Sequence, residues 1–256
     1  MLGLEPVSSR ITHITLYASR LQRLLASAKA GLRRRLVEGS RRSYAQSGED
    51  LIIDYLFTTL KAPKVRYLDI GAHHPTYLSN TYLFYEMGAS GICVEPDAAL
   101  AGAFSRTRPR DICLNVGIAP NEGVADFYQM STPTLNTFSR EQAEQYESYG
   151  KQRIERVVPV AIRNINGVLE EFFDSAPELV SLDVEGLDMA ILQSLDFARH
   201  RPAVFCVETL SYTEDQSERK LKEVIDWMAG RDYMLYADTY VNSIFVDNET
   251  WRRRGI

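Results

Sequence analysis

The stretch YLDIGAHHPTYLSNTYLFYEMGASGICVEPD, residues 67–97, decides the fold of this chain. An apolar, β-branched run over residues 65–70 comes just before Gly71 and predicts a buried strand of a parallel sheet. The spacing then predicts a helix over residues 80–87 and a second strand over residues 91–95. Strand, helix and strand in this order are typical of an α/β sheet.

The remainder of the chain continues this alternation. Helices are predicted over residues 98–106, near 141–149, and over 165–173, 189–197 and 218–228; strands are predicted over 112–116, 125–130, 179–183, 203–208, 233–237 and 243–246. The last two strands are close in sequence and must be antiparallel, because a parallel pair needs a crossover of about a dozen residues. The predicted fold class is α/β, a doubly wound and mostly parallel sheet with an antiparallel C-terminal hairpin. Ligands of such sheets bind at the carboxyl ends of the strands.

The composition is that of an ordinary soluble protein and gives no general case for nucleic-acid binding. Of 256 residues, 45% are hydrophobic and 25% are charged, and the formal net charge is -5. No run approaches the ~20 apolar residues of a transmembrane helix, and the N-terminus lacks the apolar core of a signal peptide. Cys93, Cys113 and Cys206 each lie in an apolar run and are expected to be buried thiols. We therefore expect a cytoplasmic protein.

Residues 1–42 are predicted to form a basic extension of an acidic domain. Residues 1–43 hold nine Lys and Arg residues against Glu5 and Glu38, whereas the following residues carry an acidic excess. Apolar residues recur at helical spacing over residues 11–37, which predicts an amphipathic helix. One interpretation is peripheral contact of this helix with an anionic membrane. The other, which we favour, is packing on its own domain or on a second copy in a homo-oligomer.

A nucleoside-type cofactor site is predicted where the first two strands end. An acid at the tip of the second strand accepts hydrogen bonds from ribose in such sheets, and Glu95 follows Gly71 at a suitable distance in sequence. NAD would require G-x-G-x-x-G so that the backbone approaches a pyrophosphate, but this loop has one glycine. S-adenosylmethionine has a cationic sulfonium and no phosphate, so Asp69 beside it would be favourable. The pattern favours S-adenosylmethionine, unless Asp69 and Glu95 are ordinary polar residues at strand ends.

Four segments resemble the successive blocks of FkbM-family methyltransferases. They are SYAQSGEDLIIDYLF (43–57), LDIGAHHPTYLSNTYLFYEMGASGICVEPD (68–97), TLNTF (134–138) and LVSLDVEGLDMAILQSLDF (179–197), and their order and spacing match across residues 43–247. The resemblance implies a Rossmann-like class I methyltransferase domain with a seven-stranded sheet over residues 43–256. It also implies O-methylation of sugars or of hydroxyls on secondary metabolites, with S-adenosylmethionine as the methyl donor.

The resemblance also implies roles for single residues. The loop after the first strand departs from the commoner glycine-rich form, so the contacts of its two histidines stay open. By the resemblance, Asp69, Gly71 and Glu95 would bind the cofactor. The further expected cofactor-binding residues are Ala72, His73, Pro96, Asn80 and Gln46, although the segment of Gln46 could instead only begin a helix. The expected acceptor-binding residues are His74, together with Asn136 and Thr137 in the long connection after the third strand, where specificity can reside.

An acceptor hydroxyl is a poor nucleophile until a base takes its proton or a cation lowers its pKa. Asp183 and Glu185 follow the fourth strand, and Glu208 ends the fifth; on neighbouring strands ~4.8 Å apart these carboxylates would converge. Asp183 and Glu208 could hold a divalent cation such as Mg²⁺, or the group could supply a base without metal. Glu185 is the first candidate for the base, and His73, which can titrate near neutral pH, is the second. Alternatively, Asp183 and Glu208 only cap helices or accept backbone hydrogen bonds.

The predicted function is O-methyl transfer to a small-molecule or glycan acceptor, such as a sugar or another polyhydroxylated metabolite. An NAD-dependent, sugar-modifying oxidoreductase is disfavoured by the missing glycines and by the lack of a well-placed Tyr-x-x-x-Lys pair. A non-catalytic nucleoside-binding module is disfavoured because it would not need the carboxylate group at the strand ends.

Overall fold

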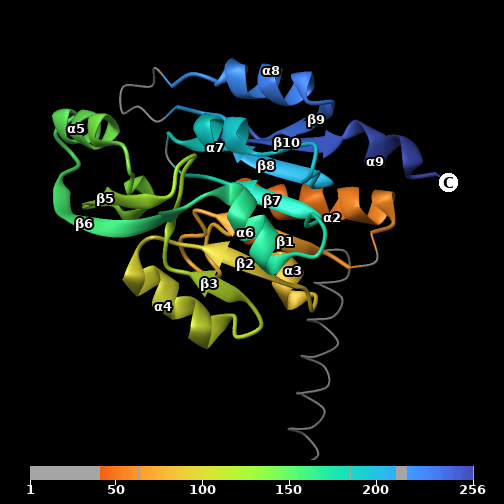
Figure 1. The fold of residues 1–256 in the computed structure, drawn as a ribbon, viewed down its shortest axis with the longest axis horizontal. Helices are drawn as coiled ribbons and strands as arrows, with labels where there is room; N and C mark the ends of the chain where they lie inside the picture. The colour runs from red at the N-terminus through yellow and green to blue at the C-terminus, as the bar shows by residue number, and fades with distance from the viewer. Residues whose placement is uncertain (1–40, 63, 185, 212–217, 256) are drawn as a thin grey trace, which may run out of the picture. The chain divides into compact units, whose positions relative to one another are not determined.

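The computed structural model describes residues 41–62, 64–184, 186–211 and 218–255 (Figure 1). The chain divides into two compact units, residues 1–42 and residues 43–256. The predicted helix over residues 11–37 lies outside the described residues and stays a prediction. In the described part of the chain, no helix combines the length and the apolar character needed to cross a membrane.

A seven-stranded sheet forms the centre of the second unit. Its strands are β1 (Arg66–Ile70), β2 (Ser90–Val94), β3 (Ile112–Leu114), β7 (Leu179–Leu182), β8 (Val204–Glu208), β9 (Tyr233–Asp238) and β10 (Asn242–Asp247). They are arranged in the order β3-β2-β1-β7-β8-β10-β9. β10 runs antiparallel to both β8 and β9, whereas the first five strands in this order are mutually parallel. The predicted mostly parallel sheet with an antiparallel C-terminal hairpin is therefore confirmed.

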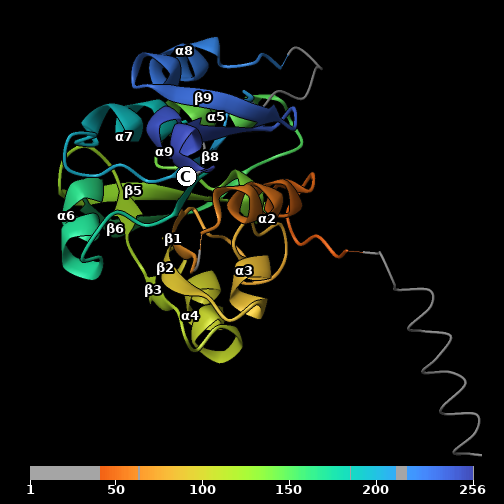
Figure 2. The ribbon, with the colours of Figure 1, turned by 90° about the vertical axis from the view of Figure 1, so that its right-hand side faces the viewer.

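Helices cover both faces of this sheet, as Figures 1 and 2 show. They are α2 (Glu49–Leu60), α3 (Tyr82–Glu86), α4 (Ala98–Thr107), α6 (Ile165–Phe172), α7 (Asp188–Ser194), α8 (Lys222–Gly230) and α9 (Asn248–Arg253). Side chains of β1 alternate between the faces. Leu68 and Ile70 pack in the core under α6, α7 and α8, whereas Tyr67 packs in the core under α2, α3 and α4. The sheet is doubly wound as predicted, although α8 begins four residues later than expected.

A second, three-stranded sheet lies between β3 and α6 in the chain. It consists of β4 (Gly117–Ile118), β5 (Gly123–Met130) and β6 (Ile154–Arg163) in the order β4-β6-β5, with η1 (Pro133–Leu135) and α5 (Arg140–Ser148) between β5 and β6. Only β5 and α5 are predicted from the sequence. Pro159 interrupts the apolar pattern of β6, because proline cannot donate to a sheet ladder. The structure accommodates Pro159 because β4 pairs only with Ile162 and Arg163, farther along the strand.

Candidate active site

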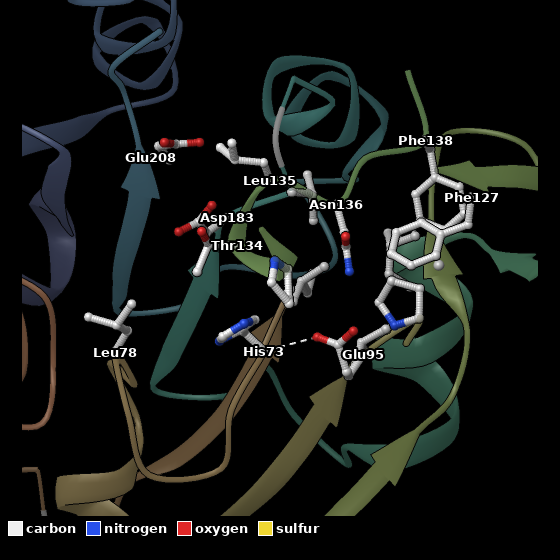
Figure 3. Close-up of a pocket in the computed structure, with 18 of the residues that line it drawn as sticks. His73, Leu78, Glu95, Phe127, Thr134, Leu135, Asn136, Phe138, Asp183 and Glu208 are labelled. Carbon is white, nitrogen blue, oxygen red and sulfur yellow. Dashed lines mark hydrogen bonds between the residues drawn. The ribbon is translucent and has the colours of Figure 1, made fainter. Parts of the chain in front are cut away.

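The strand order brings the carboxyl ends of β1, β2, β7 and β8 together. From β1 the chain continues to β2 and β3 on one side, and β7 and β8 lie on the other. Such a reversal leaves a crevice at the carboxyl ends of the strands. A cavity of about 470 Å³ lies there. Figure 3 shows His73, Glu95, Asp183 and Glu208 around it, each at the end of one of these four strands.

Gly71 allows the ends of β1 and β7 to meet at the cavity. Its φ is +78°, in the left-handed region that favours glycine, and an added Cβ would lie 1.7 Å from the carbonyl oxygen of Asp183. The amide of Asp183 donates to the carbonyl of Ile70 at 3.1 Å, so the pairing of the two strands continues to the cavity wall. Gly71 lines the cavity, as expected of a cofactor-binding residue.

Glu95 organises the loop on one side of the cavity. Its Oε2 accepts the backbone N–H of His73 at 2.7 Å, and its Oε1 accepts that of Asp97 at 2.7 Å. Asp97 in turn caps α4 by accepting the amide of Ala99 at 2.8 Å. Burial raises the pKa of Glu95 to about 8, against the lowering effect of these two backbone hydrogen bonds. Glu95 thus offers a buried carboxyl group to the cavity, with its position fixed from both sides.

His73 presents a neutral imidazole to the cavity. Its φ of +48° is unusual for a residue with a side chain, and its backbone N–H is held by Glu95. Burial, with a smaller effect of His74, lowers the pKa of the His73 imidazole, so the ring is uncharged at neutral pH. Its Nδ1 is buried without a hydrogen-bond partner among the described residues. The ring can therefore donate to, or accept from, a bound molecule.

A pair of carboxyl groups lies at the ends of β7 and β8. Burial raises the pKa of Asp183 to about 6, while a hydrogen bond with the side chain of Glu208 acts in the opposite direction. Both residues line the cavity. The predicted convergence of these two carboxylates is therefore present in the structure, and the pair holds or releases a proton near neutral pH.

The third predicted carboxylate of this group is Glu185, which lies outside the described residues. The residues that flank it are held by Asp188, whose Oδ1 accepts the amide of Val184 at 3.3 Å. Gly186 has a φ of +99°, and a Cβ on it would lie 2.5 Å from Oε1 of Gln142 in α5. The loop after β7 is thus shaped by α7 and α5. The role of Glu185 as the base stays a prediction.

Asp69 and Asn80 do not line the cavity, contrary to the expectation of direct cofactor contact. Asp69 is buried within the sheet, where Oδ2 accepts the hydroxyl of Thr81 at 2.5 Å. Asn80 is buried too and donates to the hydroxyl of Ser181 at 3.1 Å. Burial raises the pKa of Asp69, partly offset by the charge of Arg108. Its side chain points into the fold because odd-numbered residues of β1 face α2 and α3, so the favourable charge expected beside a sulfonium does not come from Asp69.

Arg108 supports the loop that carries His73, a role that the sequence does not suggest. The fully buried guanidinium pairs with Asp111 at 2.7 Å and donates to the hydroxyl of Thr81 at 3.0 Å. It also donates to the carbonyl of Pro75 at 3.3 Å. A buried charge needs such partners, and here they tie the loop after β1 to the end of α4.

The remaining predicted cofactor residues divide into two groups. Gln46 and Pro96 line the cavity. Ala72 is buried and lies outside it, and its amide donates to the carbonyl of Val94 at 3.0 Å. Ala72 therefore contributes to the pairing of β1 with β2 rather than to the cavity surface.

The predicted acceptor residues also divide. Asn136 lines the cavity; its Oδ1 accepts the amide of Met130 at 2.7 Å, and its amide nitrogen faces the cavity (Figure 3). Thr137 is buried outside the cavity and its hydroxyl donates to Oε1 of Gln142 at 3.2 Å. His74 is also outside it, where Nδ1 accepts the amide of Tyr77 at 3.1 Å. Thr137 and His74 thus shape the loops behind the cavity.

The second sheet and the segments after β8 supply cavity residues that the sequence analysis misses. Ile118, Phe127 and Phe138 form an apolar wall, in which the Phe127 and Phe138 ring centroids are 4.8 Å apart. Leu210 and Glu218 line another part of the cavity. Phe138 belongs to the TLNTF segment (134–138) quoted in the sequence analysis. That segment only weakly indicates an apolar cavity wall, because the position of β5 depends on its pairing with β6, which the sequence does not predict.

The described residues do not contain a group of three or more His, Cys, Asp or Glu side chains arranged to hold a metal ion. Asp183 and Glu208 form a pair of carboxyl groups, and oxygen ligands of this kind suit Mg²⁺. The divalent cation therefore stays a prediction, with Asp183 and Glu208 as its candidate ligands.

Comparison with known proteins identifies the family. Residues 69–235 match the family model of the methyltransferase FkbM domain. None of the curated proteins compared with the chain matches its sequence. Among solved structures, a TehB-like S-adenosylmethionine-dependent methyltransferase from Corynebacterium glutamicum has a TM-score of 0.40 and 11% identity, with 87% of this chain and 98% of that chain covered. A 1,6-didemethyltoxoflavin-N1-methyltransferase from Burkholderia thailandensis, solved with S-adenosylhomocysteine, has a TM-score of 0.39 and 9% identity, with 96% and 91% covered. Both scores are low, so the family assignment rests on the family model.

The cavity suits the methyl donor of this family. Its volume lies within the range of about 300–1,000 Å³ of small-molecule sites. Glu95 would accept hydrogen bonds from ribose hydroxyls, and the wall of Ile118, Phe127 and Phe138 offers apolar surface to a base. Neither Lys nor Arg is among the described residues that line the cavity, which favours a cationic sulfonium over a pyrophosphate. Because the matched domain spans well over half of its length, this chain belongs to the FkbM methyltransferase family and is an S-adenosylmethionine-dependent methyltransferase with the Rossmann-like class I fold.

Proposed function

We propose that this methyltransferase transfers the methyl group to a hydroxyl oxygen of a sugar, a glycan or another polyhydroxylated metabolite. The observation that carries the proposal is the hydrogen-bonded pair of Asp183 and Glu208 in the cavity. A hydroxyl needs a base before it can act as a nucleophile, and an efficient base has a pKa near the working pH. Asp183, with a pKa of about 6, meets this requirement.

S-adenosylmethionine supplies an electrophilic methyl group on a cationic sulfur. The contribution of the chain is to hold the acceptor, remove its proton and exclude water. Asp183 takes the hydroxyl proton, and Glu208 steadies the resulting acid through their hydrogen bond. Neutral His73, with its buried and unpartnered Nδ1, orients the hydroxyl or serves as the base in place of Asp183. Glu185 remains a third candidate for the base.

The walls of the cavity support this chemistry in two ways. Leu78, Leu210 and Val241 supply apolar surface that displaces water from the acceptor. The amide of Asn136 faces the cavity and offers a hydrogen bond to a polar acceptor (Figure 3). Holding the acceptor and the base in a fixed arrangement raises the rate of methyl transfer, because the entropic cost of aligning the reacting atoms is met when the acceptor binds.

The test is methyl transfer from labelled S-adenosylmethionine to a set of sugars, polyols, amines and thiols, followed by mapping of the labelled atom. Label on oxygen in wild-type protein, and its loss in Asp183→Asn with the fold retained, would support the proposal. Label on nitrogen, sulfur or carbon would refute O-methyl transfer and leave the methyltransferase assignment intact.

A further inference from the structure

The segment 43–48 precedes α2 and borders the cavity at Gln46. Its first end is fixed by Asp50, a fully buried residue of α2 whose carboxyl group accepts the amide of Tyr44 at 2.7 Å. The carbonyl of Tyr44 in turn accepts the amide of Ser79 at 2.9 Å. These hydrogen bonds tie the start of the segment to the loop that follows β1.

Glu49, the first residue of α2, fixes the other end of the segment. It is fully buried, and its Oε2 accepts the amide of Ser47 at 2.8 Å. Its Oε1 accepts the hydroxyl of Thr239 at 2.6 Å and the side-chain amide of Asn242 at 3.2 Å. A buried carboxyl group needs such donors, and here they link the segment to the turn between β9 and β10. Because Gln46 directly precedes Ser47, this link also holds the backbone of Gln46.

The two ties place Gln46 on the side of the cavity that holds the carboxyl pair. β10 lies beside β8 in the sheet, and Asn242 of β10 pairs in register with Glu208 of β8. The loop residue that bonds to the segment directly follows Leu78, which lines the cavity. Figure 3 shows Leu78 and Glu208 on one side of the cavity and Glu95 on the other.

The direction of methyl transfer makes this side the side of the acceptor. Glu95 is expected to bind the ribose of the cofactor, and Asp183 is the proposed base. Methyl transfer requires sulfur, methyl carbon and acceptor oxygen on one line, so the acceptor lies beyond the methyl group as seen from the ribose. A residue held at β10, on the far side of β8 from β2, is therefore nearer to the acceptor than to the ribose.

The side chain of Gln46 suits a hydroxyl-bearing acceptor. Its primary amide has a carbonyl oxygen that accepts hydrogen bonds and an NH2 group that donates them, and a hydroxyl does both. The side chain is exposed where it borders the cavity, so it can reach a bound molecule. Because the amide is uncharged, this recognition does not require an ionic group on the acceptor.

We propose that Gln46 binds a hydroxyl of the acceptor other than the one that is methylated, and that Glu49 is the positioning residue that holds Gln46 there. The inference rests on the proposed O-methyl transfer and adds a specificity-determining residue to it. It replaces the expectation from the sequence that Gln46 binds the cofactor.

Gln46→Ala separates acceptor binding from cofactor binding. Labelled S-adenosylmethionine is supplied with each of four neutral acceptors: methyl α-D-glucopyranoside, methyl α-D-galactopyranoside, methyl α-D-mannopyranoside and myo-inositol. The KM of every compound that accepts label should rise about three- to tenfold, as the loss of one hydrogen bond predicts, with kcat within about twofold of wild type. The Kd of S-adenosylhomocysteine, measured by calorimetry, should stay within about twofold. The matched control is Ser47→Ala, at an exposed neighbour that does not line the cavity.

Glu49→Gln tests the positioning role. Whichever way the new amide is turned, its NH2 group faces an N–H donor, either the amide of Ser47 or the side chain of Asn242, so one end of the link is lost. The acceptor KM should rise as in Gln46→Ala. In the double variant the two effects should not add, because Glu49 acts on the acceptor through Gln46.

The matched control for Glu49→Gln is Glu86→Gln. Glu86 is exposed on α3 and accepts the hydroxyl of Tyr44 at 2.6 Å. A glutamine there removes the same charge but can still accept this hydrogen bond, so the acceptor KM should not change. Additive effects of Gln46→Ala and Glu49→Gln, or an equal rise of KM in Glu86→Gln, would overturn the positioning role of Glu49.

The remaining outcomes separate this inference from the proposed function. If Gln46→Ala weakens S-adenosylhomocysteine binding as Glu95→Ala does, Gln46 belongs to the cofactor site and the inference fails. Transfer to an oxygen of these acceptors with an unchanged KM in Gln46→Ala supports the proposed function and refutes the inference. Transfer to other hydroxyl compounds but to none of the four has the same meaning, whereas transfer only to amines or thiols refutes the proposed function.

Discussion

Gly71 and Asp183 are in such close contact that a Cβ atom on Gly71 would lie 1.7 Å from the backbone oxygen of Asp183. One residue follows the first strand of the sheet and the other follows the strand beside it, although more than a hundred residues separate them in the chain. The contact sets the distance between the cofactor loop and the carboxyl pair. It also makes Gly71 essential for two independent reasons, its positive φ and the lack of space.

We expect Gly71→Ala to destabilise the fold and to abolish cofactor binding. The left-handed backbone alone costs about 1–2 kcal/mol for a residue with a Cβ, and displacement of β7 adds to this cost. Thermal unfolding should therefore shift down by several degrees. The control is Gly102→Ala in α4, where an added Cβ has no neighbour within 4 Å and should stabilise the helix by about 0.5–1 kcal/mol. Similar melting temperatures for the two variants would contradict the role of this contact.

Glu95 should be required for cofactor binding. S-adenosylmethionine or S-adenosylhomocysteine at about 100 times its Kd should stabilise the wild-type protein by about 2.7 kcal/mol, because a ligand stabilises only the state that it binds. NAD should have no effect. Glu95→Ala should lose most of the shift, whereas Glu122→Ala on the exposed turn before β5 should keep it. Equal binding by wild type and Glu95→Ala in calorimetry would remove Glu95 from the site.

The free energy of unfolding should fall as the pH rises from about 5 to 8. Burial raises the pKa of Glu95 from 4.5 to about 8 and that of Asp188 from 3.8 to about 7. Between the unfolded and folded values, the folded protein keeps a proton that the unfolded chain has released, so higher pH favours unfolding. Each such group contributes up to about 1.4 kcal/mol per pH unit. Urea unfolding at several pH values measures how steeply the free energy of unfolding falls with pH, and Glu95→Gln should make this fall less steep. If the free energy of unfolding instead rises over this range, these carboxyl groups are ionised in the folded protein.

Asp183→Asn should slow methyl transfer by ~10²–10⁴ while cofactor affinity is retained, because the asparagine side chain cannot accept the proton of the acceptor. Single-turnover rates and calorimetry with S-adenosylhomocysteine measure the two properties separately. The same measurements on Glu185→Gln and His73→Gln rank the other candidate bases. If Asp183→Asn turns over at the wild-type rate, the base is one of these two residues.

A chelator distinguishes the two roles that Asp183 and Glu208 can have. If the pair acts as a base without metal, activity should persist in chelator. If the pair holds a divalent cation, chelator should stop the reaction and Mg²⁺ or Mn²⁺ should restore it, with weaker apparent metal affinity in Glu208→Gln. We expect activity to persist, since Glu208 is followed by Thr209 and not by a further oxygen-rich ligand pair.

Deletion of residues 1–40 tests the basic extension. If it packs on its own domain or on a second copy, the truncated protein should lose solubility or change its oligomeric state, as gel filtration would show. If it lies on membranes, the full chain should pellet with anionic vesicles, less so at high salt, because salt screens the attraction. If the truncated protein no longer pellets with the vesicles but still binds the cofactor, the interpretation that the extension contacts membranes is supported.

The sequence alone was sufficient for the main sheet. Apolar runs that end in Asp69, Glu95 or Glu208 identify buried strands, since both faces of a doubly wound sheet are covered and its strands need no alternation. The hairpin of β9 and β10 followed from the short segment between them. The position of Glu95 at the cavity could be predicted as well, because the tip of the second strand lies at the edge of the sheet where ligands bind.

Only the tertiary structure decided the rest. Asp69 has the residue type expected at a cofactor site, but its side chain lies on the face of β1 that packs under α2 and α3, where it accepts the hydroxyl of Thr81. The wall of Phe127 and Phe138 depends on β6, where Pro159 hides the strand pattern. The pairing of Asp183 with Glu208 arises between segments far apart in the chain. The local sequence shows which residues are apolar and where strands end. The direction of a polar side chain depends instead on packing against residues that are distant in the sequence, and the local sequence holds no information about them.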